Sequence, residues 1–267
     1  MKSRVISGAI MVAILLPILY FGGIVYAAGV GLLATVAFKE LIDVKKDCKI
    51  PPIMKIVGLV CMLMLTYVNI DGRSILFGLS YETLSIVFLL LLAPTVFLSK
   101  KNYKIADAFY LSAVSIFLGT IFNLFIMLFN ESKILFIMVI VIASATDIFA
   151  LLGGMLIGKH KLTPISPKKT VEGAVVGTLI STIISTTYYM TLVGTASLKD
   201  GSLLTVIVIM IILSIMGQIG DLFFSLIKRE NDVKDFSNLI PGHGGILDRI
   251  DSIIFVLITF VFIIQYL

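Results

Sequence analysis

Long runs of apolar residues alternate with short polar stretches along nearly the whole chain. A helix needs about 20 mostly apolar residues to cross the hydrocarbon core of a bilayer, and runs of that kind recur throughout the sequence. They lack the alternating polarity of barrel strands, and a helix satisfies its own backbone groups in lipid. The pattern therefore predicts an all-α, polytopic integral membrane protein with about nine transmembrane helices. The predicted spans are 5–21, 23–38, 53–70, 75–98, 105–129, 134–157, 171–194, 203–227 and 250–267.

The first two spans have a second interpretation. Pro17, Gly22 and Gly23 are also compatible with a kinked re-entrant pair. Lys2 and Arg4 precede the first apolar run as in a secretory signal, but a second apolar run follows at once. We therefore interpret the first run as an uncleaved span.

The distribution of basic residues predicts the orientation. With the N-terminus inside, 18 of the 21 Lys and Arg residues fall on the cytoplasmic side, and the other three are Arg73, Lys133 and Lys199. Cytoplasmic loops of membrane proteins carry such an excess of positive charge. We expect the N-terminus inside and the C-terminus outside, in a multi-pass protein of the cell (plasma or inner) membrane.

Composition excludes a soluble globular domain. Hydrophobic residues make up 59% of the chain and charged residues 14%, with a mean hydropathy of +1.11, whereas soluble domains are about 25% charged. The net charge of +5 follows from the topogenic loops and suits an anionic inner leaflet. No recognition motif accompanies it, so no nucleic-acid partner is expected. Cys48 and Cys61 are expected to be unpaired thiols.

Two predicted cytoplasmic loops are longer and richer in charge than a simple turn requires. They comprise 158–173 and 228–251, and both lie in the C-terminal half. We therefore divide the chain into N-terminal transmembrane helices, 1–133, and a C-terminal catalytic region, 134–267.

Each of these loops follows a span that contains a carboxylate. Asp147 lies in the sixth predicted span and Asp221 in the eighth. An acidic residue at such depth costs about 2.5–3.5 kcal/mol on insertion scales, so it is expected to face a wet cavity or a cation. A packing or proton-sharing role is the alternative. Asp107, at the mouth of the fifth span, is interpreted as interfacial.

Spacing suggests a metal site. Asp221, Ser225 and Lys228 form one stripe of a helix, and Asp248 and Asp251 share a helix face three residues apart. Mg²⁺ prefers oxygen ligands and commonly binds through one or two carboxylates plus substrate phosphates. Asp221, Asp248 and Asp251 are therefore candidate metal ligands. For the last two, complementing a helix dipole is the alternative.

The same loops offer ligands for phosphate. The Gly-His-Gly-Gly turn at 242–245 allows close approach of backbone N–H groups to an anion, and 166–170 precede a predicted helix N-terminus. Carboxylates, cations and flexible glycines together are typical of metal-assisted phosphoryl transfer. The candidate cations are Lys168, Lys169, Lys228, Arg229, Lys234 and Arg249.

The segment 225–251 resembles the signature of the phosphatidate cytidylyltransferase family, with no departure from it. The Ser-Pro-Lys-Lys-Thr loop at 166–170 and the Asp147 span are also similar, and Val171 departs mildly where many members carry an aromatic residue. The resemblance is firm for about 145–252, whereas the first 140 residues match only as hydrophobic spans. The matching positions are Ser225, Lys228, Arg229, Lys234, Asp235, Ser237, Ile240, Pro241, His243, Gly244, Gly245, Asp248, Arg249 and Asp251.

The resemblance implies cytidylyl transfer from CTP to phosphatidic acid, giving CDP-diacylglycerol and pyrophosphate. It also implies a homodimer, an active site facing the cytoplasm, and Mg²⁺ with K⁺ as a second cation. His243 is either a group that orients or protonates pyrophosphate or a structural part of its turn. By this resemblance the catalytic candidates are Asp221, Lys228, Asp248 and His243. The substrate-binding candidates are Ser166, Lys168, Lys169, Thr170, Ser225, Arg229, Lys234, Asp235, Gly244, Gly245 and Arg249.

Other functions fit parts of the pattern. A polyprenol kinase or a CDP-archaeol synthase also uses CTP in a membrane, although the complete 225–251 motif favours the diacylglycerol enzyme. A transporter also buries Asp residues among its spans, but it typically shows internal repeats and broken helices near the midplane. Here the polar residues gather at one membrane face, which favours an enzyme.

Overall fold

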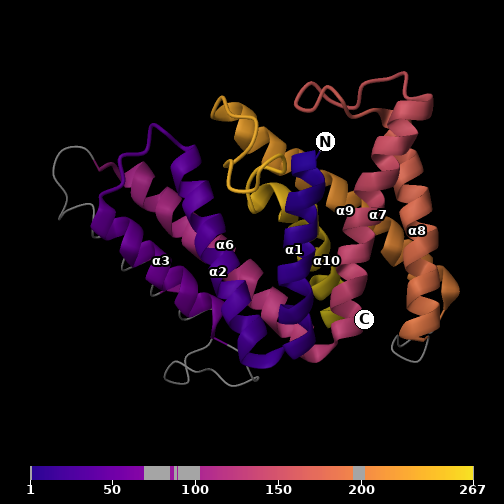
Figure 1. Ribbon diagram of the computed structural model, residues 1–267, viewed down its shortest axis with the longest axis horizontal. Helices are drawn as coiled ribbons and strands as arrows, with labels where there is room; N and C mark the ends of the chain where they lie inside the picture. Colours follow the sequence, from indigo (N-terminus) through magenta and orange to yellow (C-terminus); the bar gives the residue numbers. More distant parts are fainter. Residues whose placement is uncertain (1, 69–84, 87–88, 90–102, 195–201, 267) are drawn as a thin grey trace. The chain divides into compact units, whose positions relative to one another are not determined.

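The computed structural model describes residues 2–68, 85–86, 89, 103–194 and 202–266, and these form helices joined by loops (Figure 1). No strand occurs in this part of the chain beyond two isolated β-bridges. The helices are α1 (Lys2–Phe21), α2 (Gly23–Val44), α3 (Pro52–Thr66), α6 (Ile105–Glu131), α7 (Lys133–Ile157), α8 (Val171–Leu192), α9 (Leu203–Glu230) and α10 (Leu247–Tyr266).

The predicted all-α class is confirmed. Five of the helices, α2, α6, α7, α8 and α9, are long and apolar enough to cross a membrane, as expected of a multi-pass membrane protein. The predicted span 75–98 lies almost wholly outside the described residues. The total of about nine spans and the orientation of the termini stay predictions.

The helices pack into two compact units. The first unit combines Met1–Asn130 with Asp235–Arg249, and the second combines Glu131–Lys234 with Ile250–Leu267. The segment 158–173 therefore belongs to the second unit, whereas 228–251 is divided, with 235–249 in the first unit and its two ends in the second. The functional division predicted at 133/134 concerns chemistry and stays a prediction.

In the first unit, helices approach closely where a side chain is missing. A Cβ at Gly119 of α6 would lie 2.6 Å from the Cβ of Leu65 and 3.0 Å from the carbonyl oxygen of Met62, both on α3. Tyr26 of α2 stacks on Phe129 of α6, with ring centroids 3.8 Å apart. Close packing of this kind holds helices together in lipid, where apolar burial provides no net drive.

In the second unit, α7 and α8 run side by side (Figure 1). A Cβ at Gly177 of α8 would lie 2.8 Å from the carbonyl oxygen of Thr146 on α7. Hydrogen bonds add to this packing: the hydroxyls of Thr146 and Ser214 lie 2.8 Å apart, and the Gln218 amide donates to the Thr178 hydroxyl, also at 2.8 Å. Small residues and interhelical hydrogen bonds are the usual means of helix association in membranes.

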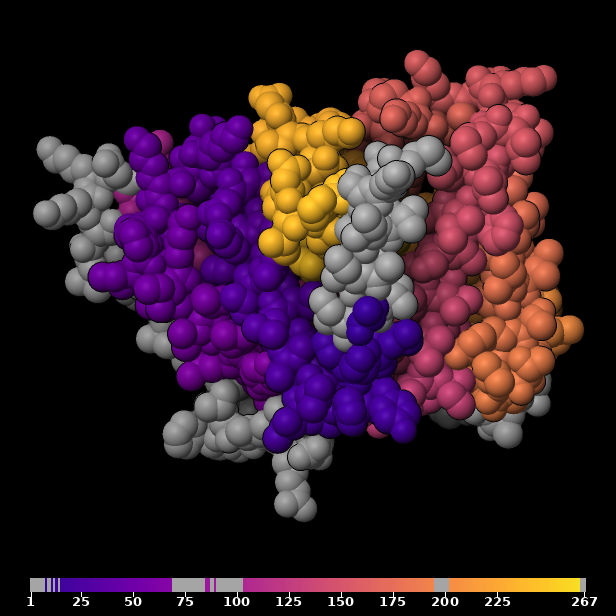
Figure 2. All heavy atoms as spheres, viewed as in Figure 1, coloured from indigo at the N-terminus to yellow at the C-terminus, as the bar shows by residue number. Residues whose placement is uncertain are grey.

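The outward faces of α7 and α8 carry exposed apolar side chains, including Leu151, Met155, Leu179 and Ile183. Both helices reach the molecular surface in the space-filling view (Figure 2). Apolar side chains on the outside are those that lipid would cover. Polar side chains such as Thr146, Ser214 and Gln218 instead meet other helices.

Candidate functional site

The loop between α7 and α8 folds back on itself as a short hairpin. The N–H of Leu162 donates to the carbonyl oxygen of Lys169, and the N–H of Val171 donates to that of His160, both at 2.9 Å. The hairpin ends where Thr170 caps α8 by accepting the Gly173 N–H at 3.1 Å. A threonine in this position satisfies one of the open N–H groups of a helix start.

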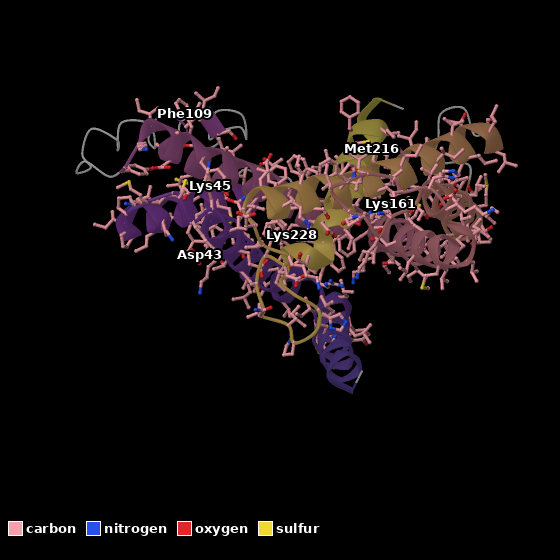
Figure 3. All side chains as sticks on the ribbon, turned by 90° about the horizontal axis from the view of Figure 1, so that it is seen from above. Asp43, Lys45, Phe109, Lys161, Met216 and Lys228 are labelled. Carbon is pink, nitrogen blue, oxygen red and sulfur yellow. The ribbon has the colours of Figure 1, made fainter. Side chains whose placement is uncertain are left out.

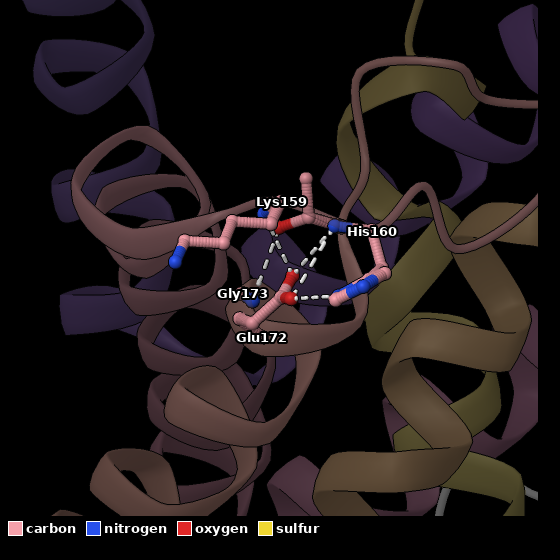
Figure 4. A network of polar contacts seen from close by, with 5 residues as sticks. Lys159, His160, Glu172 and Gly173 are labelled. Carbon is pink, nitrogen blue, oxygen red and sulfur yellow. Dashed lines mark hydrogen bonds and ion pairs between the residues drawn. The ribbon is translucent and has the colours of Figure 1, made fainter.

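Glu172 holds the base of this hairpin (Figure 4). Its carboxylate accepts the backbone N–H groups of Lys159, at 3.1 Å, and His160, at 3.2 Å, and lies 2.5 Å from the His160 Nδ1. One side chain in the first turn of α8 thereby fixes the chain at the end of α7. This constraint limits where the tip of the hairpin can lie.

From the hairpin, Lys169 reaches α9 and forms an ion pair with Asp221. Both side chains are about three-quarters buried, with 23% and 24% exposed, so solvent screens the pair less than it would a surface pair. Ser166 accepts the Lys169 N–H through its carbonyl oxygen, and Lys168 is exposed. The predicted phosphate loop and the predicted carboxylate of α9 are thus brought together.

A second carboxylate lies beside this pair. Asp251 of α10 is buried, and the charges of Asp221, Lys228 and Asp147 act on it. The hydroxyl of Ser252 donates to Asp147 Oδ2 at 2.8 Å, which ties α7 to α10. In the second unit, Asp221 of α9 and Asp147 of α7 therefore both lie within electrostatic reach of Asp251 on α10.

The register predicted for α9 is confirmed. The hydroxyl of Ser225 donates to Asp221 Oδ1 at 3.3 Å, one helical turn away, and Lys228 is buried one turn further on, at 8% exposure. Lys228 is labelled in Figure 3. Arg229 donates to the carbonyl oxygen of Val233 at 3.2 Å, near the end of the helix.

The donor set suits a hard divalent cation. Among the described residues no group of three or more His, Cys, Asp or Glu side chains is placed to hold a metal. Mg²⁺, however, commonly uses one or two carboxylates and completes its shell with water and substrate phosphates. Asp221 and Asp251, like-charged and close together, are such a pair. The pair fits Mg²⁺, and Lys169 balances part of its charge in this structure.

In the first unit, Asp248 organises the segment 235–249. Its Oδ2 accepts the backbone N–H groups of Phe236 and Gly245, both at 2.9 Å. Gly244 has φ +82°, and a Cβ there would lie 2.8 Å from the same oxygen, so this position requires glycine. Asp248 lies in the first turn of α10, as predicted, and its part in holding a metal stays a prediction.

The Gly-His-Gly-Gly turn uses its N–H groups internally. The N–H groups of His243 and Gly244 both donate to the carbonyl oxygen of Ile240, at 2.9 and 3.1 Å, and that of Gly245 goes to Asp248. An anion bound here would therefore need other donors. The roles predicted for Gly244, Gly245 and His243 in this turn stay predictions. The same holds for the roles of Lys234, Asp235 and Arg249, which are exposed.

Sequence reasoning missed Glu40. This residue of α2 is 4% exposed and accepts hydrogen bonds from Ser237, Ile246 and Leu247. The available signal was an acidic residue two positions beyond the predicted span 23–38. Because it lies near the predicted cytoplasmic end of that span, beside Lys39, it was indistinguishable from an interfacial charge.

The loop between α2 and α3 is tied to α6. The Cys48 thiol donates to Asp107 Oδ1 at 2.9 Å, and Asp107 Oδ2 accepts the Lys104 N–H at 3.1 Å. Burial and the Asp107 carboxylate raise the pKa of Cys48 to about 11. Lys45, labelled in Figure 3, lies over the Tyr110 ring, 4.6 Å from its centroid. Through its bonds to Cys48 and Lys104, Asp107 anchors this loop. Cys48 and Cys61 are both unpaired, as predicted.

Comparisons with known proteins show the family to which the chain belongs. A model described as "Cytidylyltransferase family" matches residues 2–267. A phosphatidate cytidylyltransferase of Staphylococcus saprophyticus is 36% identical, over 96% of both chains. The proteins of the same name from Staphylococcus aureus strain COL and Bacillus subtilis strain 168 are 33% and 32% identical, over 96% of this chain and 96% and 95% of theirs. The match includes the first unit, for which the sequence had indicated only hydrophobic spans. The chain belongs to the cytidylyltransferase family.

Proposed function

We propose that this protein is a phosphatidate cytidylyltransferase, a membrane nucleotidyltransferase that makes CDP-diacylglycerol and pyrophosphate from CTP and phosphatidic acid. The observation that carries the proposal is the charge cluster of Lys169, Asp221, Lys228 and Asp251 in the second unit. Relatives of that name at 32–36% identity over nearly the whole chain support it.

The reaction requires two anions to meet. An oxygen of the phosphatidate phosphate forms a bond to the α-phosphorus of CTP, and the bond from that phosphorus to the bridging oxygen of pyrophosphate breaks. The bonding electrons leave with pyrophosphate. A lipid phosphate is already ionised near neutral pH, because its second pKa is about 6, so no strong general base is required. Lys169 and Lys228 would attract and orient both phosphates.

We assign Asp221 and Asp251 as protein ligands of Mg²⁺, with Asp248 as a further candidate. Lys169 would then exchange its ion pair with Asp221 for substrate phosphate. When bound, the cation supplies charge neutralisation on the phosphates that are transferred and released. The same proposal includes K⁺ as a second cation, a homodimer and a site that faces the cytoplasm. The excess of basic residues in the predicted inner loops supports the cytoplasmic position of the site.

The test is product formation by purified protein in mixed micelles with labelled CTP, phosphatidic acid and Mg²⁺, with and without EDTA. We expect label in the lipid phase together with metal-dependent release of pyrophosphate. Transfer of a γ-phosphate to a prenol would instead indicate a polyprenol kinase. Absence of turnover under all conditions would contradict the enzyme assignment and favour a transporter.

Two variants test the cluster itself. Asp221→Asn and Asp251→Asn should each lower kcat by at least about a hundredfold, a loss of about 2.7 kcal/mol of transition-state stabilisation. Asp232→Asn is the matched control: Asp232 follows α9, is exposed and has φ +54°, a conformation that asparagine accepts readily. Wild-type turnover by either cluster variant would exclude the proposed metal ligands.

A further inference from the structure

One buried carboxylate lies outside every motif of the sequence. The side chain of Glu40 on α2 accepts three hydrogen bonds: from the Ser237 hydroxyl at 2.7 Å, from the Ile246 N–H at 2.9 Å and from the Leu247 N–H at 2.9 Å. Its donors lie about 200 positions further along the chain, and the last two are separated from it by 206 and 207 residues. Glu40 therefore joins α2 to the signature segment within the first unit.

The physical cost of burial indicates that this contact is specific. A carboxylate buried without partners loses its hydration, whereas one that accepts several N–H and O–H groups recovers much of that loss. Leu247 is the first residue of α10, so Glu40 also places negative charge at a helix start, where unsatisfied N–H groups attract it. Glu40 is thus the N-terminal cap of α10, supplied by a distant helix.

Glu40 and Asp248 divide the same turn between them. Of three consecutive N–H groups, that of Gly245 goes to Asp248 and those of Ile246 and Leu247 go to Glu40. A Cβ at Gly245 would collide with the Glu40 carboxylate, so the position of Glu40 also requires a glycine at residue 245. The backbone just before Asp248 is therefore fixed by two carboxylates, one of which is Glu40.

We propose that Glu40 is a positioning residue for the reaction: it sets the turn at 242–247 and, through that turn, the Asp248 carboxylate. This inference rests on the function proposed above, in which the signature segment serves cytidylyl transfer. Glu40 acts through the backbone of the turn, because its carboxylate accepts hydrogen bonds from Ser237, Ile246 and Leu247. A role in folding alone would leave the turnover of correctly folded protein unchanged.

The decisive variant is Glu40→Gln, which keeps the size of the side chain. The amide oxygen of glutamine still accepts a hydrogen bond. Its NH₂ group, a donor, takes the place of the second carboxylate oxygen and would face a backbone N–H group. Glu40→Asp keeps the negative charge on a side chain that is one methylene shorter. Asp43→Asn is the matched control, because Asp43 is exposed on the same helix and pairs with Lys55 at 3.0 Å, away from the turn.

Two measurements are made on each purified, full-length variant. Hydrogen exchange of the peptide covering 236–248 reports whether the N–H groups of Ile246 and Leu247 stay protected. Kinetics with CTP and phosphatidic acid separate kcat from KM, normalised to folded protein. For Glu40→Gln we expect faster exchange in this peptide and a kcat about tenfold lower, with both KM values changed less than about threefold. Glu40→Asp should recover part of kcat, and Asp43→Asn should match the wild type.

Normal kcat in Glu40→Gln, or an unchanged exchange pattern, would overturn the inference. So would a loss of folded protein with unchanged turnover of the folded fraction, because that outcome identifies a folding role. Failure of the proposed function appears differently, as absence of turnover in the wild-type protein and in Asp43→Asn.

Discussion

Gly220 of α9 lies against the main chain of Asp251 on α10. A Cβ at Gly220 would stand 2.8 Å from the Asp251 carbonyl oxygen and 2.9 Å from the Cβ of Phe255. The next residue along α9 is Asp221, so this close approach of the two helices lies beside the two carboxylates that we propose as metal ligands. The missing side chain of Gly220 thereby allows α9 and α10 to pack closely at this point.

Gly220→Ala should therefore impair both packing and activity. The added methyl group meets backbone that cannot rotate away, and overpacking of this kind costs about 1–3 kcal/mol. We expect a lower thermal midpoint and at least about a tenfold loss of kcat. Gly217→Ala is the matched control on the same helix. Its Cβ would meet a methyl group of Val256 at 3.0 Å, and a side chain can adjust. Equal effects of the two substitutions would contradict the special role of Gly220.

Lys169→Ala should lower activity by separating the hairpin from α9. Lys169 is the partner of Asp221, and removal of one member of a partly buried pair leaves the other uncompensated. We expect at least about a tenfold fall in kcat/KM for CTP. Lys161→Ala, which removes an exposed lysine of the same hairpin (Figure 3), should leave it unchanged.

A double-mutant cycle tests whether Lys169 and Asp221 act as one unit. Lys169→Ala combined with Asp221→Asn should cost less than the two single losses added together, because residues in one ion pair are coupled. Additive losses in kcat/KM would show that the pair seen in the structure has no part in turnover.

Glu172→Ala should loosen the hairpin at 158–171. The substitution removes both the backbone hydrogen bonds and the contact with the His160 ring. We expect trypsin to cleave after the exposed Lys159 or Lys161 several times faster than in the wild type, because cleavage follows local opening. His160→Ala keeps the backbone bonds to Glu172 and should be cleaved at a nearly wild-type rate. Equal protection of all three proteins would exclude the anchoring role.

Cys48 should react slowly with thiol reagents. Its pKa of about 11 lies above its ordinary value, so the thiol stays protonated between about pH 7 and 9 and the reactive thiolate is scarce. Asp107→Asn removes the carboxylate that contributes to this shift, so the pKa should fall and the alkylation rate at pH 8 should rise, by about tenfold per unit of pKa. The measurement is made in a Cys61→Ala background. An unchanged rate would mean that burial alone sets the pKa.

Asp221 and Glu40 illustrate how far the sequence reaches. Hydropathy predicted apolar helices, and residue spacing predicted the stripe of Asp221, Ser225 and Lys228, because helical periodicity is local information. The resemblance of 225–251 to a family signature is confirmed for the family, and the candidate site that it implies stays a prediction. Glu40 gave no such signal, since one acidic residue near the end of an apolar helix has the same local pattern whether it is interfacial or buried.

The sequence by itself therefore determined the all-α class, the family and the residue types of the candidate site. The tertiary structure decided which of those residues meet: Lys169 with Asp221, Ser252 with Asp147, and Glu40 with the start of α10. The physical reason is that such pairs join segments far apart in the chain. Whether two helices approach closely enough depends on volumes such as the missing side chain of Gly220, and these act only when both helices are packed.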